Sequence, residues 1–182
     1  MKKRAFVLFL IAAALGNNLL AQKEYSYSLD LTNVVEDRVH VTLVPPTPSS
    51  DQIEFQMPKI VPGTYSISDF GRFVTGFEAT DESGTPLPVD YIDQNRWLIR
   101  NAKSIKKISY WVDDTWDSKG LPRIFEPGGT NIEANTNFVL NPFGFFGYLD
   151  GMKEMPFKVT VKKPDGFYGS TALVATKSDD NE

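Results

Sequence analysis

The stretch DRVHVTLV, Asp37 to Val44, alternates polar and apolar side chains with a period of two residues. Because successive side chains of a β-strand point to opposite faces of its sheet, this pattern predicts a strand with one buried face. The buried face carries Val39, Val41 and Leu43. His40, the one histidine of the chain, lies on the opposite, polar face.

The same alternation recurs on both sides of this strand. It is found in YSYSLDL (Tyr25–Leu31), QIEFQM (Gln52–Met57), NRWLIRN (Asn95–Asn101) and KKISYWVDD (Lys106–Asp114). GFEATDESGTPLPVDY (Gly76–Tyr91) predicts two further strands that pair around the turn DESGTP. Short strands separated by turn signals, without a long helical period, predict an all-β domain: an antiparallel β-sandwich or a saddle-shaped double sheet.

One stretch, MPKIVPGTYSISDFGRFV from Met57 onward, interrupts the strands. Pro62 and Gly63 suit the middle of a tight turn, because proline fixes φ and glycine tolerates positive φ. One short helical segment is predicted near residues 66–73, with two candidate N-caps, Ser66 and Asp69. A purely structural alternative is a sandwich corner in which three aromatic side chains fill the core: Tyr65, Phe70 and Phe73.

The first 21 residues have the pattern of a secretory signal peptide. A basic start is followed by an apolar run, Ala5–Gly16, and by small residues that end at Ala21. The run is shorter than the roughly 20 residues that span a bilayer, which favours a cleaved signal over an anchor. The sequence therefore predicts export, to the periplasm, the cell surface or the medium.

Composition narrows the function classes. The predicted signal peptide carries three of the 19 basic residues and none of the 23 acidic ones, so its removal lowers the formal charge from −4 to −7. An acidic chain with scattered Lys and Arg lacks the basic footprint of a nucleic-acid binder. No second apolar run is long enough to span a membrane. The absence of cysteine excludes disulfides and thiolate ligands.

The residues offer little catalytic chemistry. One histidine rules out a zinc site with two imidazoles, and a Ser-His-Asp triad lacks the G-x-S-x-G elbow. Asp113, Asp114 and Asp117 lie close together, but without the glycine register of a calcium loop, so a solvated loop is the favoured interpretation. We predict no catalytic residue and no metal ligand in this chain.

At VPGTYSISDFGRFV the sequence resembles the N-terminal domain of the glycyl aminopeptidase family, which are zinc metallopeptidases of the gluzincin type. The family turn and its following segment are matched by Pro62, Gly63, Thr64, Tyr65, Asp69, Phe70 and Arg72. Four later segments resemble further signatures of the family, in the same order: NRWLI (95–99), ISYWV (108–112), FFGYLDG (145–151) and VKKPDGFYGSTAL (161–173).

The resemblance implies a non-catalytic β-sandwich domain at residues 22–176 and a linker at 177–182. A thermolysin-like catalytic domain with an HExxH helix and zinc would follow, and then a PDZ-like module. The chain itself needs no cofactor in this view. Its partners would be its own catalytic domain, on which it packs, and a peptide substrate, whose cleft it helps to shape.

The long irregular segment that starts at Asp113 departs from the shorter passage of the family. Substrate or interdomain contacts are predicted at Tyr65, Arg72, Trp116, Glu126 and Asn131. The alternative function is a stand-alone exported binding module for glycans or surface proteins, with the aromatic side chains between Trp111 and Phe125 as its platform. A weaker third possibility is a hydrolase that uses Asp and Glu alone.

Overall fold

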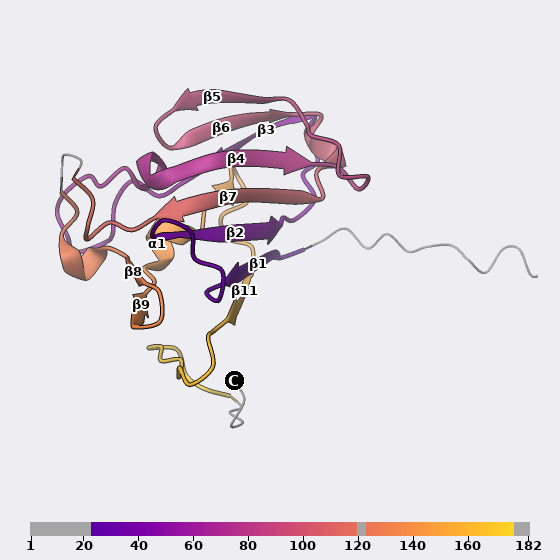
Figure 1. Cartoon of the computed structure of the whole chain (residues 1–182). Coiled ribbons are helices and arrows are strands. Elements are labelled where there is room, and N and C mark those ends of the chain that lie inside the picture. The colour runs from indigo at the N-terminus through magenta and orange to yellow at the C-terminus, as the bar shows by residue number, and fades with distance from the viewer. Residues whose placement is uncertain (1–22, 120–122, 177–182) are drawn as a thin grey trace, which may run out of the picture.

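A computed structural model describes residues 23–119 and 123–176 (Figure 1). The predicted signal peptide, residues 1–21, and the predicted linker, residues 177–182, lie outside the described residues. The elements, in chain order, are β1 (Tyr25–Asp30), β2 (Arg38–Val44), β3 (Gln52–Gln56), the 3-10 turn η1 (Phe70–Phe73), β4 (Val74–Thr80), β5 (Val89–Asp93), β6 (Arg96–Arg100), η2 (Ala102–Ser104), β7 (Lys107–Asp113), η3 (Glu126–Gly128), β8 (Asn131–Glu133), β9 (Asn137–Val139), α1 (Pro142–Phe145), β10 (Tyr148–Leu149) and β11 (Phe157–Lys162).

The strands form two sheets and a hairpin, so the prediction of an all-β double sheet is confirmed. One sheet has the order β11-β1-β2-β7-β4 and the other the order β10-β3-β6-β5, while β8 pairs with β9 (Figure 1). The strand pairs are antiparallel except β1 with β11, which run parallel. In the part of the chain that the structure describes, no helix has the length and hydropathy of a membrane span.

The core lies between the two sheets. Val39, Val41 and Leu43 of β2 are fully buried, as the alternation of DRVHVTLV predicts. Aromatic rings join the sheets: the centroids of Phe77 and Trp97 are 4.9 Å apart in a stacked arrangement. Such ring pairs add to the free energy gained by burying their area.

Inward tyrosines of the first sheet hold the chain segment between α1 and β10. The Tyr110 hydroxyl donates to the Phe145 carbonyl at 2.6 Å, and the Tyr27 hydroxyl donates to the Gly147 carbonyl at 2.7 Å. The Tyr25 hydroxyl accepts from the amide of Leu149, and burial raises the pKa of Tyr25 to about 12. These phenols therefore stay protonated and serve as structural hydrogen-bonding groups.

The two strands predicted around the turn DESGTP are present, but β4 and β5 do not pair with each other as predicted. β4 pairs with β7 in the first sheet, whereas β5 pairs with β6 in the second. The two segments pair over a short stretch beside the turn. There the Leu87 amide donates to the Ala79 carbonyl at 2.8 Å, the Asp81 amide donates to the Thr85 carbonyl at 3.0 Å, and Thr80 and Pro86 form an antiparallel bridge. Alternation shows which side chains face inward but not which sheet a strand joins, and here the turn carries the chain from one sheet to the other.

Candidate functional site

A loop from Lys59 to Ser68, called here the tyrosine loop, projects between β3 and η1. At its tip the Thr64 amide donates to the Val61 carbonyl at 3.2 Å, and Gly63 has a φ of 92°. Pro62 and Gly63 therefore occupy the centre of a tight turn, as predicted. At its base the Lys59 carbonyl accepts from the amides of Ser68 and Asp69, at 2.7 and 3.0 Å.

Tyr65 stands at the tip of this loop. Its side chain is 97% exposed, and its φ of 55° lies in the left-handed region. A bulky side chain is seldom found at a positive φ. Strained backbone of this kind persists only where the surrounding structure holds it in place, and it is concentrated at functional sites. The alternative in which Tyr65 fills the core is wrong, whereas Phe70 and Phe73 are buried as it requires.

The predicted helical segment is shorter than expected, and its capping differs. It is the single 3-10 turn η1 (Phe70–Phe73), and Asp69 precedes it without a capping hydrogen bond from its side chain. The Asp69 carboxylate instead accepts from the Asn95 side chain at 2.7 Å. The Asn95 amide oxygen in turn accepts from the Gly71 amide at 3.0 Å.

Asn95 is thus a structural residue of the site that sequence reasoning did not assign. It is 2% exposed and lies in the β5–β6 turn, yet it ties the start of η1 to the second sheet. Its only sequence signal is its position at the head of NRWLI, one of the segments that carry the family resemblance.

The second wall of the site is η3, which packs against the tyrosine loop. A Cβ placed on Gly128 would lie 3.1 Å from the Thr64 side chain and 3.7 Å from that of Val61. The Trp116 indole donates to the Glu126 carbonyl at 3.0 Å. The fold therefore brings Trp116 and Glu126 together, beside the loop that carries Tyr65.

Apolar side chains remain exposed around this end. Phe125 is 61% exposed and Ile67 is 65% exposed, and Trp116 is 40% exposed despite its hydrogen bond. Tyr65 and Ile67 belong to the tyrosine loop, and Trp116 is bonded to η3, which packs against that loop and directly follows Phe125. Such a surface suits contact with a peptide or a neighbouring protein surface.

The carboxylates of DDTWD have a structural use. Asp114 is buried, and its carboxylate accepts from the amides of Trp116, Asp117 and Ile132. Burial raises the pKa of Asp113, against the opposing effect of Arg38. Among the described residues no cluster of His, Cys, Asp or Glu is placed to hold a metal ion.

The other two predicted contact residues lie away from the tip. The Arg72 side chain donates to the Ser68 carbonyl at 3.1 Å, and its guanidinium lies 4.5 Å from the centre of the Phe73 ring. Burial lowers the pKa of Arg72, with Asp69 opposing. Asn131 is 3% exposed, and its amide donates to Asn137 across the β8–β9 hairpin at 3.0 Å.

Comparison with known proteins gives two findings. The family model of the peptidase M61 N-terminal domain matches residues 26–182. The crystal structure of an aminopeptidase N family protein from Idiomarina loihiensis is similar in fold, with a TM-score of 0.64 and 21% sequence identity over 78% of this chain. This chain spans 22% of the length of that protein. A search of curated proteins found no match.

Proposed function

The chain belongs to the peptidase M61 N-terminal domain family, and from that premise we propose that it is the non-catalytic front domain of an exported zinc aminopeptidase. In this role it packs on a catalytic domain downstream and shapes one wall of the substrate cleft. The observation that carries the proposal is the family match, which covers almost the whole chain after the predicted signal peptide.

The zinc of this enzyme belongs to the downstream domain. The described residues hold no cluster suited to a metal ion, and the chain has one histidine and no cysteine. The finer assignments, a glycyl aminopeptidase with a PDZ-like module after the catalytic domain, are supported by the ordered signatures of the sequence. Export is supported by the charged, apolar and small-residue pattern of residues 1–21.

The tyrosine loop is the part of this domain that we assign to the substrate cleft. Its tip is held by the Val61–Thr64 turn and by contact with η3, so Tyr65 is presented without a further conformational change. A contact group that is already fixed loses little entropy when a ligand binds. Trp116 and Glu126, which meet at η3, form the adjoining part of the same wall.

The stand-alone binding module has less support. Its platform requires neighbouring rings in a row, but Trp111 contacts His40 and Arg38 on β2, while Trp116 bonds to η3. Within residues 23–119 and 123–176 no ring pair links Trp111, Trp116 and Phe125.

The first test is the intact mass of the native product, purified from its source and assayed for zinc and aminopeptidase activity. We expect a mass far above that of this chain, bound zinc, and activity that a chelator removes. A mass equal to that of residues 22–182 would contradict the proposal.

The second test is Tyr65→Asn in the full-length enzyme. We expect kcat/KM for a peptide substrate to fall roughly tenfold, as for the loss of one aromatic contact, with zinc content unchanged. Tyr91→Asn is the control, because Tyr91 is an exposed tyrosine on β5, the edge strand of the β10-β3-β6-β5 sheet. Equal activity of both variants would remove Tyr65 from the cleft.

A further inference from the structure

The apolar side chains on the inner face of β11 are partly exposed, unlike those of the neighbouring strand β1. β11 pairs in parallel with β1, so that Phe157, Val159 and Val161 stand beside Tyr25, Tyr27 and Leu29. Residues paired in this way point to the same face of the sheet. The β1 side chains are at most 2% exposed, whereas those of β11 are 41–42% exposed. The apolar face of the sheet therefore continues for one strand past the residues that cover it.

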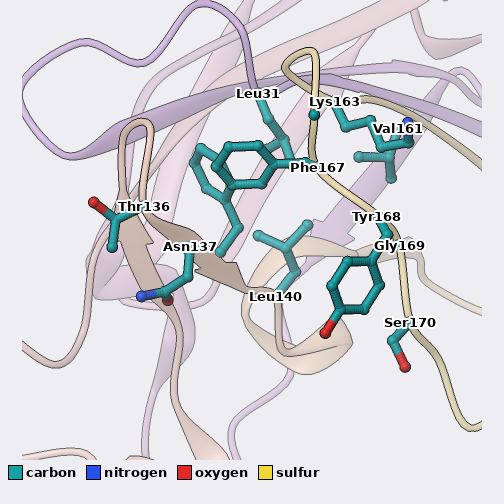
Figure 2. A pocket seen from close by; sticks show the side chains of 12 residues that line it. Leu31, Thr136, Asn137, Leu140, Val161, Lys163, Phe167, Tyr168, Gly169 and Ser170 are labelled. Atoms are coloured by element: carbon teal, nitrogen blue, oxygen red, sulfur yellow. The ribbon is translucent and has the colours of Figure 1, made fainter.

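A groove of about 650 Å³ adjoins this face (Figure 2). Its floor is apolar, with Leu140 lying between Phe167 and Tyr168 and with Leu31 and Val161 at its upper end. Its rim is polar and consists of Thr136, Asn137, Lys163 and Ser170. An apolar centre within a polar rim is the usual arrangement of a protein interface.

The chain after β11 builds one side of the groove. The Phe167 amide donates to the Pro164 carbonyl at 3.2 Å, in a turn where Gly166 has a φ of 82°. This turn returns the chain to the β8–β9 hairpin, where the rings of Phe167 and Phe138 lie 5.8 Å apart. The segment 163–170, which follows β11, therefore forms one side of the groove, and residues 136–140 line another part of it.

We propose that the β11 face (Phe157, Val159 and Val161), together with this groove, docks an apolar surface of the domain that follows in the same polypeptide. This inference rests on the proposed function, because it requires a downstream domain. β11 is the last strand described, and the chain leaves along the groove toward Leu173 and Val174, which are 80% and 90% exposed. A domain tethered there is held at high effective concentration, so a surface of modest area is sufficient.

Pairing of a foreign strand with the free edge of β11 is the less suitable mode. Lysines on an edge strand discourage such pairing. β11 carries Lys158 and Lys162 on its outer face, and Lys162 is bonded to Asp30 at 3.0 Å. The apolar inner face, rather than the backbone edge, is therefore the surface that a partner would cover.

The test measures thiol accessibility in the full-length protein. This chain has no cysteine, so Val159→Cys and, as control, Ile92→Cys each add one thiol to it. The two side chains are similarly exposed, at 41% and 43%, but Ile92 lies on β5 at the edge of the other sheet. Alkylation rates are measured with and without urea, and mass spectrometry locates the label.

We expect the thiol of Val159→Cys to react at least about tenfold more slowly than that of Ile92→Cys in the native protein, and at the same rate in urea. Equal native rates would overturn docking at the β11 face. Val161→Cys provides a second probe if Val159→Cys does not fold. Protection that disappears on dilution would identify a second copy as the occupant and would also overturn the proposal.

The docking inference and the proposed function fail separately. A longer product with zinc and peptidase activity, but with a freely reactive thiol in Val159→Cys, would leave the function and reject the docking surface. A longer product without zinc or peptidase activity, but with a protected thiol at any dilution, would reject the peptidase and leave a docked downstream domain.

Discussion

The tyrosine loop and the β11 face expose apolar side chains in different ways. The loop is fixed by hydrogen bonds at its tip and its base, and it presents Tyr65 from a strained backbone. The β11 face has an ordinary extended backbone at the edge of its sheet, and its apolar side chains are 41–42% exposed although the β1 side chains beside them are buried.

This difference indicates two kinds of contact. A strained, braced tip presents one or two side chains in a fixed geometry, which suits a small ligand or a specific point of contact. The β11 face, which continues the apolar face of the core, offers a broad apolar surface without a fixed contact group. Such a surface suits a large apolar partner. One domain of this size thus carries a candidate substrate contact and a candidate interdomain seam at separate places (Figure 1).

The largest effect is expected from adding one methyl group beside each region, in η1 next to the tyrosine loop and in the tail that follows β11. A Cβ on Gly71, in η1 directly after the tyrosine loop, would lie 2.1 Å from the Gln94 carbonyl oxygen, so the backbone would have to move. A Cβ on Gly169, in the tail beside the groove, meets nothing within 4 Å. We expect Gly71→Ala to lower the free energy of unfolding by about 3 kcal/mol, and Gly169→Ala to change it by less than about 0.5 kcal/mol.

Urea unfolding of the full chain, followed by tryptophan fluorescence, measures both variants. Equal effects would mean that the tail is packed as tightly as η1, and the contrast between the two regions would fail.

The features that could be predicted from the sequence are those set by a local pattern of residues. Alternation identified the buried faces of β1 and β2, and Pro62 with Gly63 located the turn of the tyrosine loop. These features follow from φ preferences and from the two-residue period of a strand, both of which are local properties.

Long-range pairing was not predictable in this way. Nothing near β4 and β5 shows that they belong to different sheets, or that β11 returns parallel to β1. The hydrogen bond that the Asn95 side chain donates to Asp69, 26 residues away, likewise leaves no trace in a local pattern. The exposure of the β11 face depends on how the strands are arranged in the fold, which the pattern of a single strand does not encode.

The backbone strain at Tyr65 gives a second, smaller prediction. Asparagine tolerates the left-handed region, and the exposed ring contributes little packing, so Tyr65→Asn should leave stability unchanged or raise it by up to about 1 kcal/mol. Tyr65→Val should lower stability by a similar amount, because a β-branched side chain fits a positive φ poorly. Thermal unfolding compares the two variants. Loss of stability in both would mean that the ring is packed rather than presented.

The smallest effect is expected at the charge pair that joins β1 to β11. The Asp30 carboxylate accepts from Thr32 and from Lys162, and these bonds lower its pKa below 3.8, with the Thr32 hydroxyl as the larger cause. A lowered carboxylate pKa stabilises the fold above the unfolded value, and this contribution is lost as the pH falls through the folded value.

Lys162→Ala should therefore cost less than about 1 kcal/mol at neutral pH, as is usual for an exposed pair, and the cost should vanish in acid. In an NMR titration, Thr32→Val should raise the Asp30 pKa more than Lys162→Ala does. β11 should stay paired with β1 in both variants, because the backbone ladder and the Phe157 ring, 4.5 Å from that of Tyr25, hold it there. Detachment of β11 in Lys162→Ala would show that charge, and not apolar contact, keeps the β11 face in place.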